Sequence, residues 1–267
     1  MSAGRSGEIS YELAGSGDPI VFIQGVGVHG SGWKPQTDAL SACYSCLTFD
    51  NRGIGNSVAG GKEITIPRMA EDALALMDAQ GWNSANIVGH SMGGLIALQS
   101  ALTAPARVRT LSLLCTFARS DATRLTPRML WIGLRTRIGP RAMRRRAFLE
   151  LVAPPGGIEG DADALAERLG TIFGHDLADS PPVAMKQLSA MSRCDLTPRL
   201  GELAGIRTLV VSAEHDLIAP PASGRAIAEG IPGARYVEIA GAAHGVPIVR
   251  AERINALLAE HVSGLRT

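Results

Sequence analysis

Several features are scarce in this sequence, and each scarcity excludes a class of protein. Only 4 cysteines occur in 267 residues, too few for a disulfide framework. No apolar run approaches the roughly 18 residues that a membrane-spanning helix needs. Lys and Arg number 26 against 25 Asp and Glu, so the chain lacks the basic excess typical of nucleic-acid-binding proteins. We therefore expect neither a membrane span nor a nucleic-acid partner.

Signals for export, metals and cofactors are also missing. Residues 1–11 are polar and glycine-rich, without the apolar segment of a signal peptide, so we expect a soluble cytoplasmic protein. The six histidines show no metal-ligand spacing, and the glycines around Val26 lack the helix-opening glycine of a dinucleotide-binding loop. Cys43 and Cys46 form a C-x-x-C that could be a redox or metal pair, but no two further ligands match it. The interpretation as small residues at a helix-to-strand junction is favoured, and no metal or cofactor is expected.

What the sequence does contain is an ordinary globular composition. Apolar residues make up 46% and charged residues 19%, which excludes a mainly disordered chain. The 31 glycines show no three-residue period, which excludes a collagen-like structure. The length allows one large domain or two small ones.

The first half of the chain alternates short buried strands with amphipathic helices. This alternation predicts an α/β fold with a mostly parallel sheet covered by helices on both faces. The predicted strands are 19–23, 45–49, 85–88, 108–114, 206–212 and 236–239. The predicted core helices are 67–80, 92–103, 219–229 and 247–261.

Between 118 and about 200 the alternation stops and only helical patterns remain. Helices are expected at 127–138, 140–152, 161–173 and 181–192. No Pro/Gly/Ser-rich linker flanks this segment, so it is interpreted as a cap on one domain. The expected division is a core of residues 1–117 and 201–267 with a helical cap insertion at 118–200.

The cap carries an arginine-rich stretch and many apolar side chains. Between Ala122 and Leu149 there are eight arginines and no acid, either a solvated helix face or a surface for an anionic partner. We expect some of the apolar cap residues to pack the cap and others to cover a substrate pocket. The arginines are 124, 128, 135, 137, 141, 144, 145 and 146, and the apolar candidates are Met129, Leu130, Trp131, Ile132, Leu134, Met143, Phe148 and Leu151.

The strongest chemical signal is the segment Gly89-His90-Ser91-Met92-Gly93-Gly94. It lies between a predicted strand and a predicted helix, where G-x-S-x-G forms a sharp turn that exposes the serine. Glycine is needed two residues to either side of the serine because side chains there would collide with the neighbouring strand and helix. Ser91 is therefore the candidate nucleophile.

A serine nucleophile needs a base, and the base needs an acid that orients it. Two later strands are each followed by suitable residues at the sheet edge where such residues gather. Asp216 follows the strand 206–212, and His244 follows the strand 236–239. The chain order Ser91, Asp216, His244 predicts a catalytic triad, with Glu214 as an alternative acid and His215 as an exposed neighbour.

With these motifs the chain resembles the α/β-hydrolase superfamily over nearly its whole length. It is most similar to small cofactor-free serine esterases, enol-lactonases and haloperoxidase-like hydrolases. Asp50-Asn51-Arg52-Gly53 begins a segment that resembles the family's D-x-R-G-x-G-x-S loop, where Asp50 and Arg52 have structural roles. The resemblance implies an α/β-hydrolase fold with a helical cap inserted after the sixth strand.

The resemblance also implies an oxyanion hole made by backbone N–H groups. Val26 would supply one donor and Met92, the residue after the nucleophile, the other. Where the family usually has His-Gly, this chain has Gln24-Gly25, so Gln24 is a candidate for bracing the loop or contacting substrate. His29 lies in the same loop and could reach substrate or be structural, and His90 is expected to be packed and hydrogen-bonded.

These elements together predict a serine hydrolase that cleaves a small carboxylic ester or lactone. A serine at the elbow favours an acyl-enzyme, because related enzymes that open epoxides or remove halogens have a carboxylate there. The alternatives are a C–C bond hydrolase, a thioesterase or a cofactor-free perhydrolase with the same triad, or a small-molecule receptor without turnover. The expected partner is a small-molecule substrate, and the expected state is a monomer or homodimer.

Overall fold

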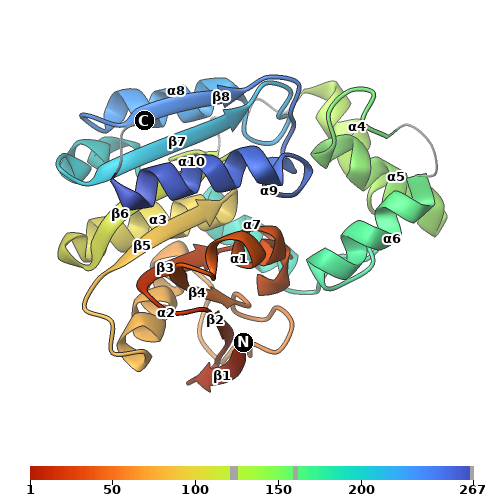
Figure 1. Cartoon of the computed structure of the whole chain (residues 1–267). Helices are drawn as coiled ribbons and strands as arrows, with labels where there is room; N and C mark the ends of the chain where they lie inside the picture. Colours follow the sequence, from red (N-terminus) through yellow and green to blue (C-terminus); the bar gives the residue numbers. More distant parts are fainter. Residues whose placement is uncertain (121–125, 159–161, 265–267) are drawn as a thin grey trace.

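Eight strands form one sheet at the centre of the molecule, in the order β1-β2-β4-β3-β5-β6-β7-β8 (Figure 1). The computed structural model describes residues 1–120, 126–158 and 162–264. β1 pairs antiparallel with β2, and β2 with β4, whereas all other neighbours are parallel. The strands are β1 Ser2–Ser6, β2 Ile9–Ala14, β3 Asp18–Ile23, β4 Tyr44–Phe49, β5 Ala85–His90, β6 Val108–Leu114, β7 Arg207–Ala213 and β8 Arg235–Ile239.

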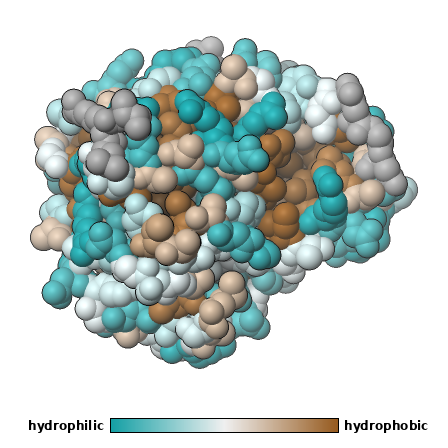
Figure 2. Space-filling view, viewed as in Figure 1, coloured by the Kyte–Doolittle hydropathy of each residue, from teal (hydrophilic) through white to brown (hydrophobic). Residues whose placement is uncertain are grey.

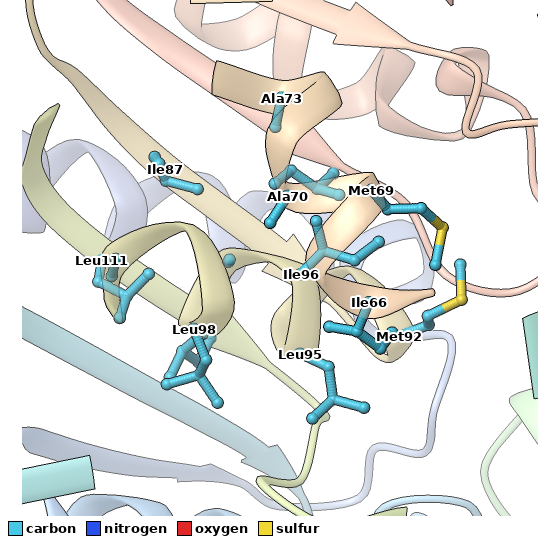
Figure 3. Packing of buried hydrophobic residues seen from close by; sticks show 14 of the residues in the cluster. Ile66, Met69, Ala70, Ala73, Ile87, Met92, Leu95, Ile96, Leu98 and Leu111 are labelled. Atoms are coloured by element: carbon cyan, nitrogen blue, oxygen red, sulfur yellow. The ribbon is translucent and has the colours of Figure 1, made fainter. Parts of the chain in front are cut away.

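Helices cover both faces of this sheet, as the alternating pattern predicted. They are α1 Lys34–Leu40, α2 Ile66–Ala79, α3 Met92–Thr103, α4 Pro127–Arg135, α5 Arg141–Val152, α6 Ala162–Phe173, α7 Ala184–Ser192, α8 Pro221–Gly230, α9 Val246–Val249 and α10 Ala251–Ser263. α1, α9 and α10 lie on one face and α2, α3 and α8 on the other (Figure 1). Figure 3 shows part of the second layer, where Ala70 of α2 lies beside Ile96 of α3 and Ile87 of β5 belongs to the same buried cluster.

Three of these elements, β1, β2 and α1, were not predicted from the sequence, and one predicted helix is divided. The hairpin β1–β2 lies at the sheet edge, and its side chains are mostly exposed or half-buried, so it lacks a clear apolar alternation. α1 is seven residues long and carries Pro35 in its first turn. The predicted helix 247–261 is in fact two helices, because the backbone of Arg250 leaves helical geometry at φ −123° and ψ 39°.

In the order of the chain, the helices α4 to α7 come between β6 and β7. α4, α5 and α6 stand away from the sheet, beyond the edge formed by the carboxyl ends of the parallel strands (Figure 1). Phe173 and Leu177 of this segment pack with Val28 of the core, and Val183, Ala190 and Met191 around α7 join the main core cluster. The division into a core (1–117 and 201–267) and a cap (118–200) stays a prediction about folding units. None of the described helices has the length and apolar character required to cross a membrane.

Candidate active site

The turn between β5 and α3 holds Ser91 in a strained backbone conformation. Its φ is +56° and its ψ is −123°, a region that side-chain-bearing residues rarely occupy. A Cβ on Gly89 would lie 2.2 Å from the carbonyl oxygen of Gly93, and a Cβ on Gly93 would lie 2.0 Å from that of Ile23. The two flanking glycines are therefore required by close backbone approach, from the helix in one case and from β3 in the other.

Hydrogen bonds brace this turn from the neighbouring strand. The Ser91 N–H donates to Leu114 O at 3.0 Å, and the Thr116 hydroxyl donates to Ser91 O at 2.6 Å. The serine side chain thereby stands at the N-terminus of α3, where the helix dipole favours developing negative charge.

Asp216 and His244, which are 28 residues apart in sequence, form a buried hydrogen-bonded pair. His244 Nδ1 lies 2.8 Å from Asp216 Oδ2, and the aspartate side chain is fully buried. The other carboxylate oxygen accepts from the backbone N–H groups of Ile218 and Ala219, both at 2.8 Å. Burial alone would raise the pKa of Asp216, but the imidazole and these two donors outweigh it and lower the pKa, so the carboxylate stays ionised. Because a carboxylate can only accept a hydrogen bond, Nδ1 of His244 is the nitrogen that donates to Asp216, and Nε2 is the nitrogen left to accept a proton.

Glu214, the alternative acid, is directed elsewhere. Its carboxylate accepts from the Gly241 N–H at 2.8 Å and lies 3.8 Å from the ring of its neighbour His215. Both side chains are more than one-third exposed. The geometry thus brings Asp216 to His244 and leaves Glu214 at the surface.

His90 packs against His244 from the elbow side. The two ring centroids are 4.8 Å apart, and His90 Nε2 lies 2.9 Å from the His244 backbone carbonyl. Burial, with His244 nearby, lowers the pKa of His90 to about 3, so its neutral ring donates to that carbonyl. This contact fits the expected packed and hydrogen-bonded histidine and fixes the backbone that carries His244.

One cluster of potential metal ligands occurs among the described residues, and it contains the pair itself. Ligand-type atoms of Cys115, Asp216 and His244 lie within 4.8 Å of one another. Burial, together with the charge of Asp216, raises the pKa of the Cys115 thiol well above its ordinary value. A protonated thiol is a poor ligand, and the two other groups already bond each other, so this donor set suits a hydrogen-bonded pair better than a metal ion.

The loop after β3 passes close above Ser91. A Cβ on Gly25 would lie 3.1 Å from Ser91 Cβ, closer than most real Cβ contacts, so a larger residue here would push against the serine. The hydrogen bonds of the described residues leave the backbone N–H groups of Val26 and Met92 without a protein partner. Two unpaired donors beside the serine hydroxyl are what an oxyanion hole requires.

Of the two candidates for bracing or substrate contact, Gln24 bonds within its own loop, whereas His29 faces Asp50 in the loop after β4. Gln24 is buried, and its Oε1 lies 3.2 Å from the Gly25 N–H. His29 Nδ1 lies 4.0 Å from Asp50 Oδ1, and the same carboxylate oxygen accepts from the Gly30 N–H at 2.8 Å. Neither side chain is among the residues that line the cavity above Ser91.

A cavity of about 270 Å³ lies above Ser91 and His244, between the core and the cap. Figure 2 shows a hydrophobic hollow on this side of the molecule, between the core and the cap helices. Of the eight apolar cap candidates, only Phe148 and Leu151 line the cavity. Leu130, Trp131 and Leu134 are instead exposed at 58%, 61% and 48%. A larger hollow of about 840 Å³ beside Glu214 and Leu217 is not lined by Ser91.

Sequence reasoning missed most of the cavity wall. The missed residues include Val28, Phe173, His175, Leu177, Leu188 and Met191. Phe173, Leu188 and Met191 are apolar positions of helices, but periodicity does not say whether such a side chain faces the sheet or the cavity. Val28 and Leu177 lie in loops, where no periodicity applies. His175 alone offered a chemical signal, as a histidine within the cap.

Four residues of the arginine-rich stretch, Arg135, Arg141, Arg145 and Arg146, form ion pairs within the cap. Arg137 instead lines the cavity above Ser91. Arg141 and Arg145 both reach Asp176, at 2.7 Å and 2.9 Å, and Arg135 reaches Glu150 at 3.2 Å. The two guanidinium groups lower the pKa of Asp176. Arg124 lies outside the described residues. The paired arginines fasten the segment after α6, which supplies part of the cavity wall.

The chain matches a known protein family over most of its length. A family model described as the alpha/beta hydrolase fold matches residues 18–251. The chain belongs to the alpha/beta hydrolase family. The strand order, the elbow after β5 and the cap helices after β6 agree with the fold expected from the sequence.

Relatives of this alpha/beta hydrolase include proteins with different names. It is 31% identical to a candidate carbamate hydrolase, RutD, of Azorhizobium caulinodans, over 96% of this chain and 95% of the relative. A candidate non-heme bromoperoxidase, BpoC, of Mycobacterium tuberculosis superposes with a TM-score of 0.83 at 28% identity, covering 97% of each chain. An enol-lactonase of Burkholderia xenovorans superposes with a TM-score of 0.79 at 29% identity, covering 96% of each. The family and these relatives support a hydrolase acting on a small molecule.

Proposed function

We propose that this alpha/beta hydrolase cleaves a small carboxylic ester or lactone through an acyl-enzyme on Ser91. The observation that carries the proposal is the buried His244–Asp216 hydrogen bond of 2.8 Å at the floor of an apolar cavity lined by Ser91. Among the described hydrogen bonds none joins Ser91 to His244, and such bonds often tighten only when substrate binds.

In this mechanism the Ser91 hydroxyl attacks the carbonyl carbon while His244 Nε2 takes the hydroxyl proton. Asp216 keeps Nδ1 protonated and stabilises the imidazolium that forms. The N–H groups of Val26 and Met92 donate to the carbonyl oxygen as it becomes negatively charged. The imidazolium then protonates the leaving alkoxide, and the neutral imidazole next activates water, which releases the acid and regenerates Ser91.

The cavity supports a small, mostly apolar acyl group. Phe148, Leu151, Phe173 and Leu177 surround the space above the serine. A volume of about 270 Å³ is at the lower end of ligand pockets in general. We therefore expect short acyl chains to be preferred over long ones.

A carbamate is the second candidate substrate class, favoured by the 31% identity to the relative named as a candidate carbamate hydrolase. A carbamate carbonyl would undergo the same attack by Ser91. An assay that includes a p-nitrophenyl carbamate beside the esters separates the two classes by the ratio of their kcat/KM values.

The test is turnover of p-nitrophenyl esters from acetate to octanoate, an enol-lactone and the carbamate. We expect multiple turnovers that Ser91→Ala abolishes, and one adduct on Ser91 after reaction with a serine-directed phosphonate. Full activity in Ser91→Ala, or an adduct elsewhere, would overturn the nucleophile assignment. One slow turnover with a ligand-induced rise in melting temperature would instead indicate a receptor, and peracid formation from acetate and peroxide a perhydrolase.

A further inference from the structure

Gly27, the residue after the proposed oxyanion donor Val26, is held by two side chains of the cap. Its N–H donates to Gln187 Oε1 on α7 at 3.0 Å, and its carbonyl oxygen lies 3.0 Å from His175 Nε2. These partners are 160 and 148 residues away in sequence. Both backbone polar groups of one oxyanion-loop residue are therefore bonded to the cap.

Gln187 is fully buried and bonded at both ends. Its Oε1 binds Gly27, and its Nε2 lies 3.5 Å from the backbone carbonyl of Arg52 in the loop after β4. A buried carboxamide is stable only when such partners are present, so this side chain has a single satisfied orientation. Gln187 thus links α7 to two core loops at once.

We propose that Gln187 is a positioning residue that aims the Val26 N–H at the reacting carbonyl by fixing Gly27. Gly27 has a φ of +76°, and the peptide between Val26 and Gly27 carries the N–H that Gln187 accepts. Holding this peptide restricts the backbone angles of Val26 and therefore the direction of its own N–H. The inference rests on the proposed function only for its catalytic consequence, because the contact itself is structural.

Gln187 differs from a residue that shapes the substrate pocket. Its neighbours on α7, Ala184, Leu188 and Met191, line the cavity, whereas Gln187 does not. A lost pocket contact would change KM, and a lost link between cap and core would lower the melting temperature alone. A misdirected oxyanion donor stabilises the negative charge of the transition state less well, and this lowers kcat.

The experiment compares Gln187→Met with Lys186→Met in the full-length chain. The first variant keeps the side-chain length but removes the acceptor, and the second places methionine at the adjacent exposed position of the same helix. With p-nitrophenyl acetate we expect kcat to fall about tenfold in Gln187→Met, less than for loss of a whole donor, with KM within about twofold. Burial favours the neutral acid in Gln187→Glu, which keeps an acceptor for Gly27 and an O–H donor for the Arg52 carbonyl, so kcat should stay within about threefold.

A second measurement reads the loop without turnover. Labelling with ¹³C-carbonyl valine and ¹⁵N-glycine selects Val–Gly pairs, of which the sequence has only Val26-Gly27 and Val88-Gly89. In Gln187→Met the Gly27 amide should shift and exchange faster with solvent, while the Gly89 amide in β5 serves as the internal reference.

Three results would overturn the inference. They are an unchanged kcat with an unchanged Gly27 amide, a rise in KM alone, or equal losses in Gln187→Glu and Gln187→Met. If the wild type shows no Ser91-dependent turnover, the proposed function fails, and the Gly27 amide still decides whether Gln187 holds the loop. If Gln187→Met does not fold, Gln187→Asn, which withdraws the amide by one methylene, is measured in the same way.

Discussion

His244 is held at its side chain by Asp216 and at its backbone by His90. Asp216 bonds Nδ1 at 2.8 Å, and His90 bonds the carbonyl oxygen at 2.9 Å. The lowered pKa of Asp216 keeps that carboxylate charged, and the lowered pKa of His90 keeps the second ring neutral. The orientation of the proposed base therefore depends on one charged neighbour, Asp216, and one neutral neighbour, His90.

His244→Ala and Asp216→Asn should each lower kcat by several orders of magnitude, because the base and the group that orients it act as one unit. The double variant should then be little worse than the poorer single variant. Steady-state kinetics with p-nitrophenyl acetate measure all three. Losses that multiply would show that the two residues act independently, and Glu214→Gln would be the next variant to measure.

Gln24→Ala should lower kcat about tenfold with little change in KM, equivalent to roughly 1.4 kcal/mol of transition-state stabilisation. The reason is that Gln24 Oε1 bonds the Gly25 N–H and lies outside the cavity wall. Gln24→His, the residue usual in the family, should keep most activity. A KM change that varies across the ester series, with kcat constant, would instead place Gln24 in contact with substrate.

The turn from β5 into α3 is the element on which the site depends most. It combines the positive φ of Ser91 with two glycines whose missing side chains leave room for backbone atoms. The neighbouring loops fit the same geometry, since Gly25 approaches Ser91 from β3 and Thr116 braces it from β6. A small displacement of any of these elements would move the nucleophile.

Gly93→Ala should destabilise the protein by about 3 kcal/mol or more, because the new methyl group would lie 2.0 Å from the backbone oxygen of Ile23. Gly133→Ala in α4 is the matched control, since a Cβ there meets no atom within 4 Å. Alanine has the higher helix propensity, so that variant should be neutral or up to about 1 kcal/mol more stable. Urea unfolding followed by circular dichroism measures both, and equal effects would contradict the clash.

Two histidines, the buried His261 and the half-buried His90, make the whole molecule sensitive to acid. Burial lowers the pKa of His261 to about 4 and that of His90 to about 3, from an ordinary value of 6.5. Between these values and 6.5 the unfolded chain binds more protons than the folded chain, so the free energy of unfolding falls as the pH falls. Between its folded-state pKa and 6.5, each histidine lowers the free energy of unfolding by up to about 1.4 kcal/mol for each pH unit of acidification. Above pH 6.5 it has no such effect.

His261→Gln should make the free energy of unfolding fall less steeply between pH 6.5 and 4. At pH 8 the free energy of unfolding should be nearly unchanged, because the glutamine amide can replace the hydrogen bond of 3.2 Å that Nε2 makes to Leu111 O. His215→Gln, at a side chain that is 39% exposed, is the control and should follow the wild type. Denaturant midpoints across this pH range give the comparison. A decline of equal steepness in His261→Gln would show that other groups cause the acid sensitivity.

Much of the core could be predicted because it depends on local patterns. The buried strands β3 to β7 are apolar runs bounded by turn residues, and the glycines of the elbow, the acid and the histidine each follow a predicted strand. Parallel strands place their carboxyl ends at one edge, so the order of these motifs sufficed to bring Asp216 beside His244. Their catalytic roles stay predictions until the variants are measured.

The contacts across the molecule were decided only by the tertiary structure. The hydrogen bond from the Gly27 N–H to Gln187 joins residues 160 positions apart. No sequence pattern around either residue indicates that the two are partners. The same is true of the edge hairpin β1–β2 and of the direction in which the cap side chains point. In both cases the neighbouring elements, and not the periodicity of the sequence, decide which side is buried. The sequence by itself thus determined the parallel part of the sheet and the order of the catalytic candidates, whereas three-dimensional packing decided the edge hairpin, the pocket and what holds the loop after β3.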